Sequence, residues 1–168
     1  AIAAASSLGV TFEAAVDAMS RFEGVKRRME RTATAGDIAI YDDFAHHPTA
    51  IRKTIASMRQ RFPGRRVVVA IEPRSNTMKM GIHNETLADS LAAADHIWMY
   101  RPPDMGDALV ESLAPLGKKL SLHSDYDDLV SSMSRKVQGG DQVVFMSNGG
   151  FGSARQTLTA LLQRTRGS

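Results

Sequence analysis

The stretch VVVAI, at Val67–Ile71, is an unbroken run of apolar residues, most of them β-branched. A strand with one face in water alternates polar and apolar residues, whereas a continuous apolar run is typical of a strand covered on both faces of a parallel sheet. Similar runs recur at His96–Tyr100, Lys119–Leu122 and Gln142–Met146. The pattern therefore predicts a parallel sheet with VVVAI among its buried strands.

Helical patterns lie between these runs. From Pro48, a residue favoured in the first turn of a helix, Ile51, Ile55 and Met58 recur at intervals of four and three, and the pattern ends at Pro63–Gly64. Four later helices are expected; they carry Leu87 and Leu91, Leu109 to Leu113, Leu129 to Val137, and finally Ser153–Leu162. Strands that alternate with helices predict an α/β fold: a Rossmann-like, doubly wound, mostly parallel sheet with helices on both faces.

The chain before Pro48 has a different pattern. A helix is expected to begin near the cap residue Thr11 and to end before Gly24, with one apolar face. Two short strands, Arg27–Ala33 and Asp37–Asp42, are then expected to be joined by a turn at 35–37.

The composition is that of an ordinary globular domain. The chain has 168 residues, 43% hydrophobic and 23% charged, and no cysteine, which excludes disulfides and thiolate chemistry and is compatible with a cytoplasmic location. No apolar run is long enough to cross a membrane, and a net charge of +3 does not require a nucleic-acid partner. The densest basic stretch is interpreted as a solvated surface; it contains Arg59, Arg61, Arg65 and Arg66.

Three polar segments follow predicted strands. They are YDDFAHHP at Tyr41–Pro48, EPRSNTMKMG at Glu72–Gly81 and SNGGFG at Ser147–Gly152. The carboxyl ends of parallel strands meet at one edge of a sheet, and ligands of such sheets bind there. We therefore expect these segments to form one site.

YDDFAHHP permits three interpretations. Asp42, Asp43, His46 and His47 could bind a metal ion, although adjacent histidines in a loop tend to point in different directions. One histidine could cap the helix that begins at Pro48, with Asp42 bonded to the loop backbone. Alternatively, an acid at the strand tip could hold a ribose while an imidazole contacts the nucleotide.

The other two segments suit anionic ligands. The planar fork of Arg74 could hold a carboxylate or phosphate, with neutral donors from Ser75, Asn76 and Thr77 beside it, or it could simply pair with Glu72. The backbone N–H groups of SNGGFG could cradle an anion, or its glycines could only make a tight turn.

These segments, in this order and together with FEGVKRRME before them, resemble the C-terminal domain of the Mur ligases over about residues 24–163. By this resemblance, residues 1–23 are the tail of the family's central ATPase domain and the linker, and residues 24–168 are the C-terminal domain. YDDFAHHPT together with EPRSNTMKMG is most similar to the member that joins UDP-N-acetylmuramate to L-alanyl-γ-D-glutamyl-meso-diaminopimelate. YDDFAHHPT alone is also similar to the member that adds L-alanine.

The resemblance implies roles for particular residues. Arg28 falls at the catalytic arginine that reaches the γ-phosphate of ATP. Asp43 falls at the acid that holds the ribose, with His46 and, less consistently within the family, His47 in the ATP site. The expected peptide-binding residues are Arg74, Ser75, Asn76, Thr77, Asn148 and Gly149.

The resemblance also implies the reaction. ATP and Mg²⁺ convert a carboxylate into an acyl phosphate, which an incoming amine attacks to form an amide. This chain has no G-x-x-x-x-G-K-[ST] phosphate loop and no counterpart of the family's modified lysine or Mg²⁺-binding residues, so we expect an excised domain that works with central and N-terminal domains and is inactive alone. Two alternatives stay open: a non-catalytic nucleotide-binding module, and a metal-dependent hydrolase built on the Asp-His segment.

Overall fold

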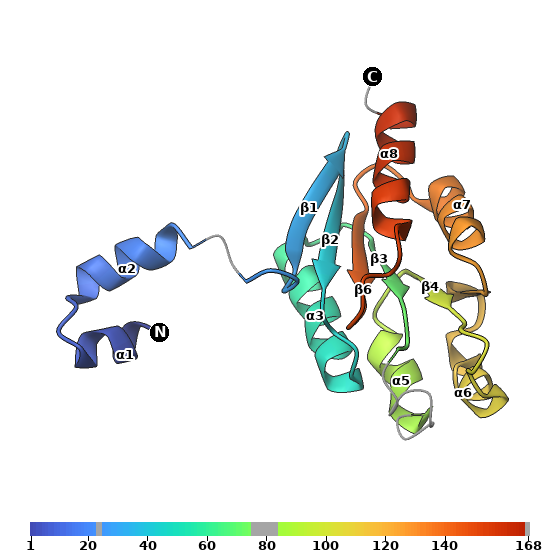
Figure 1. Cartoon of the computed structure of the whole chain (residues 1–168), viewed down its shortest axis with the longest axis horizontal. Helices are drawn as coiled ribbons and strands as arrows, with labels where there is room; N and C mark the ends of the chain where they lie inside the picture. Colours follow the sequence, from blue (N-terminus) through green and yellow to red (C-terminus); the bar gives the residue numbers. More distant parts are fainter. Residues whose placement is uncertain (23–24, 75–83, 167–168) are drawn as a thin grey trace.

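The computed structural model describes residues 1–22, 25–74 and 84–166. Its centre is a six-stranded sheet with the order β1-β2-β6-β3-β4-β5 (Figure 1). Strand β1 is antiparallel to β2, and the other neighbouring strands are parallel. The strands are β1 (Glu30–Ala35), β2 (Ile38–Asp43), β3 (Val67–Ile71), β4 (His96–Tyr100), β5 (Leu120–His123) and β6 (Gln142–Met146). The mostly parallel sheet is confirmed.

Helices cover both faces of the sheet. One hydrophobic core includes residues of α3, α5, α6 and the 3₁₀ helix η1, and the other includes residues of α7 and α8. The helices are α1 (Ile2–Ser7), α2 (Phe12–Ser20), α3 (Pro48–Arg61), α5 (Asn84–Leu91), α6 (Asp107–Ser112), η1 (Ala114–Lys119), α7 (Tyr126–Lys136) and α8 (Ala154–Arg166).

Strand β3 shows why its sequence does not alternate. Val67, Val69 and Ile71 belong to the first core, whereas Val68 and Ala70 belong to the second. Every side chain of the strand is fully buried. A strand between two helical layers needs apolar residues at every position, and this confirms the interpretation of VVVAI.

The first strand begins later than expected. The sequence predicts a strand from Arg27, but β1 starts at Glu30, because Arg27 and Met29 have φ values of 57° and 50°. Residues with positive φ cannot continue an extended strand. The segment before β1 is therefore a bent approach to the sheet, and it places its side chains differently from a strand.

Two further boundaries differ from expectation. The helix expected around Leu109 to Leu113 is two pieces, α6 and η1, and the end of η1 is bent at Gly117, where φ is 52°. Strand β5 ends at His123, one residue later than expected.

The two N-terminal helices stand apart from the sheet (Figure 1). Helix α2 begins where the sequence predicts, and the Thr11 hydroxyl accepts a hydrogen bond from the Ala14 N–H at 3.2 Å. The apolar side of α2 is exposed, with Phe12 63% and Met19 44% accessible, and Phe22, just beyond the helix, is 56% accessible. The pair also borders an apolar groove of about 400 Å³. These helices therefore leave apolar surface uncovered. No described helix is both long and apolar enough to cross a membrane.

The strand ends are level at the edge that was expected to bind ligand. Asp43 of β2 is in register with Met146 of β6, which is in register with Ile71 of β3. The pairing continues one step further, because Ser147 N–H donates to the Asp43 carbonyl and Glu72 N–H donates to the Met146 carbonyl. The three polar segments therefore leave the sheet side by side.

Candidate functional site

Asp43 is buried at the end of β2. Its side chain is 3% exposed, and its carboxylate accepts hydrogen bonds from Met29 N–H at 2.7 Å, Ala45 N–H at 2.8 Å and the Thr54 hydroxyl at 3.2 Å. These bonds tie the bent approach to β1, the loop after β2 and helix α3 together. The carboxylate of Asp43 therefore holds together the three segments that form the predicted nucleotide-binding part of the site.

Arg28 is exposed beside this carboxylate. Its guanidinium lies 5.6 Å from the centre of the Phe44 ring, close enough for a cation–π contact, and it forms no ion pair with any acid in the described residues. Arg28 borders two hollows, one of about 280 Å³ shared with Asp43 and Lys53 and one of about 530 Å³ shared with Arg31 and Arg61. An exposed guanidinium without a carboxylate partner is available to bind phosphate oxygens.

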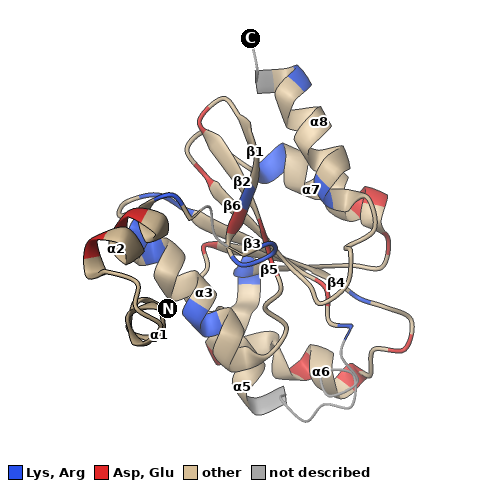
Figure 2. Ribbon diagram, turned by 60° about the vertical axis from the view of Figure 1, so that its left-hand side comes forward, with Lys and Arg blue, Asp and Glu red and all other residues tan. Residues whose placement is uncertain are grey.

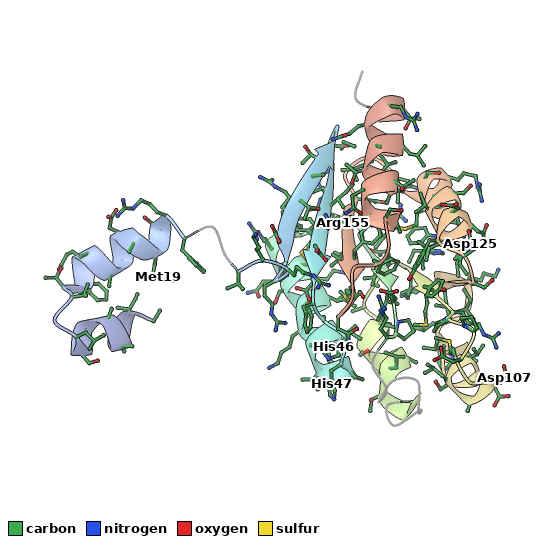
Figure 3. The ribbon with its side chains drawn as sticks, in the orientation of Figure 1. Met19, His46, His47, Asp107, Asp125 and Arg155 are labelled. Atoms are coloured by element: carbon green, nitrogen blue, oxygen red, sulfur yellow. The ribbon has the colours of Figure 1, made fainter. Side chains whose placement is uncertain are left out.

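The two histidines have different local roles (Figure 3). His46 Nδ1 lies 2.9 Å from the Phe44 carbonyl, to which it donates, and the two rings meet edge to face. His47 is the N-cap of α3, and its Nδ1 accepts a hydrogen bond from Thr49 N–H at 3.3 Å. The interpretation of one histidine as a helix cap is confirmed for His47.

Asp42 is bonded differently from expectation. Its carboxylate lies 3.5 Å from Arg27 Nε and 3.4 Å from Arg155 Nη2, and no bond to the loop backbone is seen among the described residues. Arg155 lies at the start of α8, as Figure 3 shows. The expected Asp42–backbone bond is replaced because two guanidiniums reach the carboxylate.

Glu72 is a buried acid at the end of β3. It is 2% exposed and accepts hydrogen bonds from the hydroxyl groups of Tyr126 and Ser147, the latter at 2.6 Å. Burial, and next the bond to Glu72, raise the pKa of Tyr126 above its usual value. Arg74 Nη1 lies 4.0 Å from Glu72, so the expected pair is present at the limit of an ion pair. The Arg74 side chain is 56% exposed and can still bind a ligand.

The turn at 147–149 lies between Arg74 and Arg27. The Arg27 guanidinium donates to the carbonyls of Ser147, at 2.5 Å, and Gly149. A Cβ on Gly149 would lie 2.5 Å from Arg74 Nη1 and 2.6 Å from Arg74 Cδ, so Arg74 occupies the space of the missing side chain. Asn148 Oδ1 is buried without a hydrogen-bond partner among the described atoms. The glycine is therefore required for the close approach of Arg74.

A cluster of aromatic rings packs against the residue that follows the 147–149 turn region, Phe151. Phe151 has a φ of 53° and is buried, with its ring beside Phe145 and Tyr126. Tyr126 in turn stacks on Tyr100 with ring centres 4.3 Å apart. The segment SNGGFG is thus anchored at Phe151, and its bonds to side chains go beyond those of a simple tight turn.

The structure brings most of the predicted site residues to one edge. Arg28, Asp43, His46 and His47 lie at the end of β2, and Arg74, Asn148 and Gly149 lie at the ends of β3 and β6. Ser75, Asn76 and Thr77 lie outside the described residues. A separate hollow of about 510 Å³, at the ends of β4 and β5, contains none of the predicted residues.

Sequence reasoning missed the roles of Arg27, Glu72 and Tyr126. Ser147 and Tyr126 bond to Glu72 from 75 and 54 residues away, and Arg27 reaches the turn across 120 residues or more. The only local signal was the position of Glu72 after a fully apolar strand, where a buried acid needs partners.

Metal binding and the basic stretch have simpler outcomes. The described part of the chain contains no group of three or more His, Asp or Glu residues placed to hold a metal ion, which gives the hydrolase alternative no ligand set.

Arg59, Arg65 and Arg66 pair with nearby aspartates, consistent with a surface role. Figure 2 shows basic and acidic residues spread over several elements.

The chain that forms this sheet matches a known protein family. The chain belongs to the Mur ligase family, because residues 27–149 match the family model of the Mur ligase glutamate ligase domain. This confirms the resemblance and the Rossmann-like fold.

Particular relatives are similar along nearly the whole chain. A UDP-N-acetylmuramate–L-alanyl-γ-D-glutamyl-meso-2,6-diaminoheptandioate ligase of Escherichia coli K12 is 40% identical over 159 residues, which cover 94% of this chain and 35% of that ligase. A murein peptide ligase structure from Psychrobacter arcticus 273-4 is also 40% identical, with a TM-score of 0.74, over 96% of this chain and 35% of that one. A domain structure of a putative ligase of the same kind from Haemophilus ducreyi 35000HP is 35% identical, with a TM-score of 0.68, over 80% of this chain and 99% of that one. The chain thus spans about a third of the full-length ligases.

Proposed function

We propose that this chain is the C-terminal domain of an ATP-dependent ligase that joins UDP-N-acetylmuramate to L-alanyl-γ-D-glutamyl-meso-diaminopimelate in the recycling of cell-wall peptidoglycan. The observation that carries the proposal is the 40% identity to a ligase named for this tripeptide, over 94% of the chain. The site geometry supports it, because the groups suited to a nucleotide at the end of β2 and the carboxylate-binding Arg74 after β3 lie at the same edge of the sheet, with β6 and its 147–149 turn between them.

The nucleotide side would be formed around Arg28. Its exposed guanidinium would stabilise negative charge on the γ-phosphate as the muramate carboxylate becomes an acyl phosphate. His46 would contact the nucleotide from the loop after β2, with His47 beside it. Asp43 would hold the ribose; its carboxylate already bonds to three protein groups, so a ribose hydroxyl would use a remaining lone pair.

The peptide side would be formed by Arg74. A planar guanidinium matches a carboxylate with two parallel hydrogen bonds, and the tripeptide carries several carboxylates. Asn148 and Gly149 would line the same pocket, and we place Ser75, Asn76 and Thr77 there as well. The peptide amine would then attack the acyl phosphate and displace phosphate.

The rest of the active site would come from other domains. The described residues offer no carboxylate cluster for Mg²⁺, so its ligands would lie in the central domain, together with the phosphate loop. Residues 1–23 would be the tail of that domain and the linker, and residues 24–168 the C-terminal domain. Domain closure would exclude water from the labile acyl phosphate. A cytoplasmic location fits the need for ATP.

The test is amide formation by the full-length parent protein. Phosphate release from ATP would be measured with UDP-N-acetylmuramate and either the tripeptide or L-alanine, and turnover with the tripeptide alone is expected. Faster turnover with L-alanine would assign the alternative substrate while leaving the ATP chemistry in place. No phosphate release with either amine would favour a non-catalytic nucleotide-binding module.

The role of Arg74 has its own test in the parent enzyme. Arg74→Ala should raise the KM for the tripeptide while leaving the KM for ATP nearly unchanged, because the side chain follows β3, which β6 separates from the residues at the end of β2. An equal loss of ATP affinity would contradict the assignment.

A further inference from the structure

Arg27 links the two sides of the site, although it precedes Arg28 by one residue. Its backbone carbonyl accepts the Phe44 N–H at 2.8 Å, and its guanidinium lies 5.2 Å from the centre of the Phe44 ring. Its own backbone N–H donates to Glu30 at 2.8 Å. The φ of 57° turns the residue out of the path of β1. The backbone of Arg27 is therefore fixed on the nucleotide side.

The guanidinium of Arg27 points to the other side. One nitrogen, Nη2, donates to both the Ser147 and Gly149 carbonyls, while Nε faces Asp42 at 3.5 Å. The side chain is only 32% exposed, so these bonds are partly shielded from water and correspondingly stronger. Both carbonyls belong to a turn that otherwise would need water or other donors.

Gly149 contacts both Arg27 and Arg74. Its carbonyl is held by Arg27, and Arg74 packs into the space where a Cβ would stand. Glu72 also restrains this turn, because its carboxylate accepts a hydrogen bond from the Ser147 hydroxyl. The same hydroxyl accepts a hydrogen bond from the Gly149 N–H at 2.8 Å. The position of the turn therefore decides where the Arg74 guanidinium can lie.

We propose that Arg27 is a positioning residue for peptide binding: it fixes the 147–149 turn, and the turn fixes Arg74. This inference rests on the proposed function for the identity of the ligand, a peptide carboxylate. Arg27 thus affects peptide binding, although Arg28, the next residue in the sequence, is proposed to bind the nucleotide.

The first experiment compares Arg27→Lys with Arg164→Lys in the full-length parent enzyme. Lysine keeps a positive charge but has one nitrogen in place of Nε and Nη2, so it cannot face Asp42 with one atom and donate to both carbonyls with another. We expect the KM for the tripeptide to rise about tenfold, since small misplacements of binding groups have effects of this size. The KM for ATP should stay unchanged. Arg164→Lys, at an exposed residue on α8, should change neither KM.

The second readout does not depend on activity. Hydrogen–deuterium exchange of peptides spanning 147–151, followed by mass spectrometry on the same full-length proteins, should be faster in Arg27→Lys and unchanged in Arg164→Lys. If Arg27→Lys does not fold, Arg27→Gln, which keeps a donor but loses the charge and the fork, takes its place.

The outcomes separate this inference from the proposed function. A higher tripeptide KM with faster exchange at 147–151 supports it. A change in ATP KM alone, unchanged exchange, or a lower melting temperature with both KM values intact would overturn it. If the unmodified enzyme does not use the tripeptide, the proposed function fails, and exchange at 147–151 alone decides for or against the role of Arg27 in the turn.

Discussion

Both carboxylate oxygens of Asp43 accept hydrogen bonds from the protein itself, which gives a single side chain a structural as well as a proposed nucleotide-binding role. If Asp43 served only to bind nucleotide, Asp43→Ala would weaken nucleotide contact without affecting the stability of the domain. The buried bonds to Met29 and Ala45 lead to a different expectation, because the substitution leaves their N–H groups without partners.

Asp43→Ala should therefore lower the free energy of unfolding by about 2–4 kcal/mol, since each buried donor left unsatisfied costs about 1–3 kcal/mol. Urea unfolding of the domain measures this directly. Thr54→Val is the matched control, because it removes only the single 3.2 Å bond to the same carboxylate and should cost less. Equal stability of Asp43→Ala and the unmodified domain would show that these bonds contribute nothing net.

Gly149→Ala tests the close approach of Arg74. The new methyl group would stand 2.5–2.6 Å from Arg74 atoms, so the exposed Arg74 side chain must move while the fold is kept. We expect a higher tripeptide KM in the parent enzyme and a nearly unchanged melting temperature. Gly150→Ala is the control, because no described atom lies within 4 Å of the position that its methyl group would take, and its kinetics should not change.

At the scale of elements, the strands and helices could largely be predicted from the sequence because their signals are local. The apolar runs and the 3.6-residue periodicity identified β3, β6, α3 and α7 from neighbouring residues alone. The predicted start of β1 was wrong, because the chain is bent before Glu30, where Arg27 contacts residues 120 or more positions away. The buried partners of Glu72 were missed for the same reason.

The β4–β5 pair contains a histidine that should make stability depend on pH. Burial, and then the positive charges of Lys136, Arg66 and His123, lower the pKa of His96 from 6.5 to about 4. Its Nε2 lies 3.1 Å from the Ser121 hydroxyl. Since the folded state resists protonation, the stabilisation is complete above pH 6.5 and decreases as the pH falls from 6.5 to about 4.

His96→Gln should flatten this part of the pH profile. Urea midpoints measured between pH 7 and pH 4 compare the variant with the unmodified domain; the latter should lose more stability over this interval. Parallel profiles for His96→Gln and the unmodified domain would contradict the assignment.

At the scale of the whole molecule, the two N-terminal helices leave large apolar side chains exposed, while the sheet and its covering helices bury theirs. The proposed division at residue 23 explains this difference, because α1 and α2 would pack against a central domain. The sequence predicted the apolar face of α2 but not that it would lack a partner among the described residues of this chain.

Removal of residues 1–22 should leave the melting temperature of the remaining domain within about 2 °C, since changes distant from a core have small effects. The same deletion should reduce self-association, because it removes Phe12, Phe22 and the other exposed apolar residues. Differential scanning calorimetry and light scattering measure the two effects. A marked loss of thermal stability would show that α1 and α2 belong to the same folding unit as the sheet.

Strand β6 has a consequence for how the molecule is made. It pairs with β2 on one side and β3 on the other, yet it is the last of the six strands to be synthesised. While residues 142–146 are still inside the ribosome, the emerging chain holds two unjoined pieces of sheet with open edges. Completion of the fold, and with it the joining of the proposed nucleotide and peptide halves of the site, therefore has to wait until β6 has emerged.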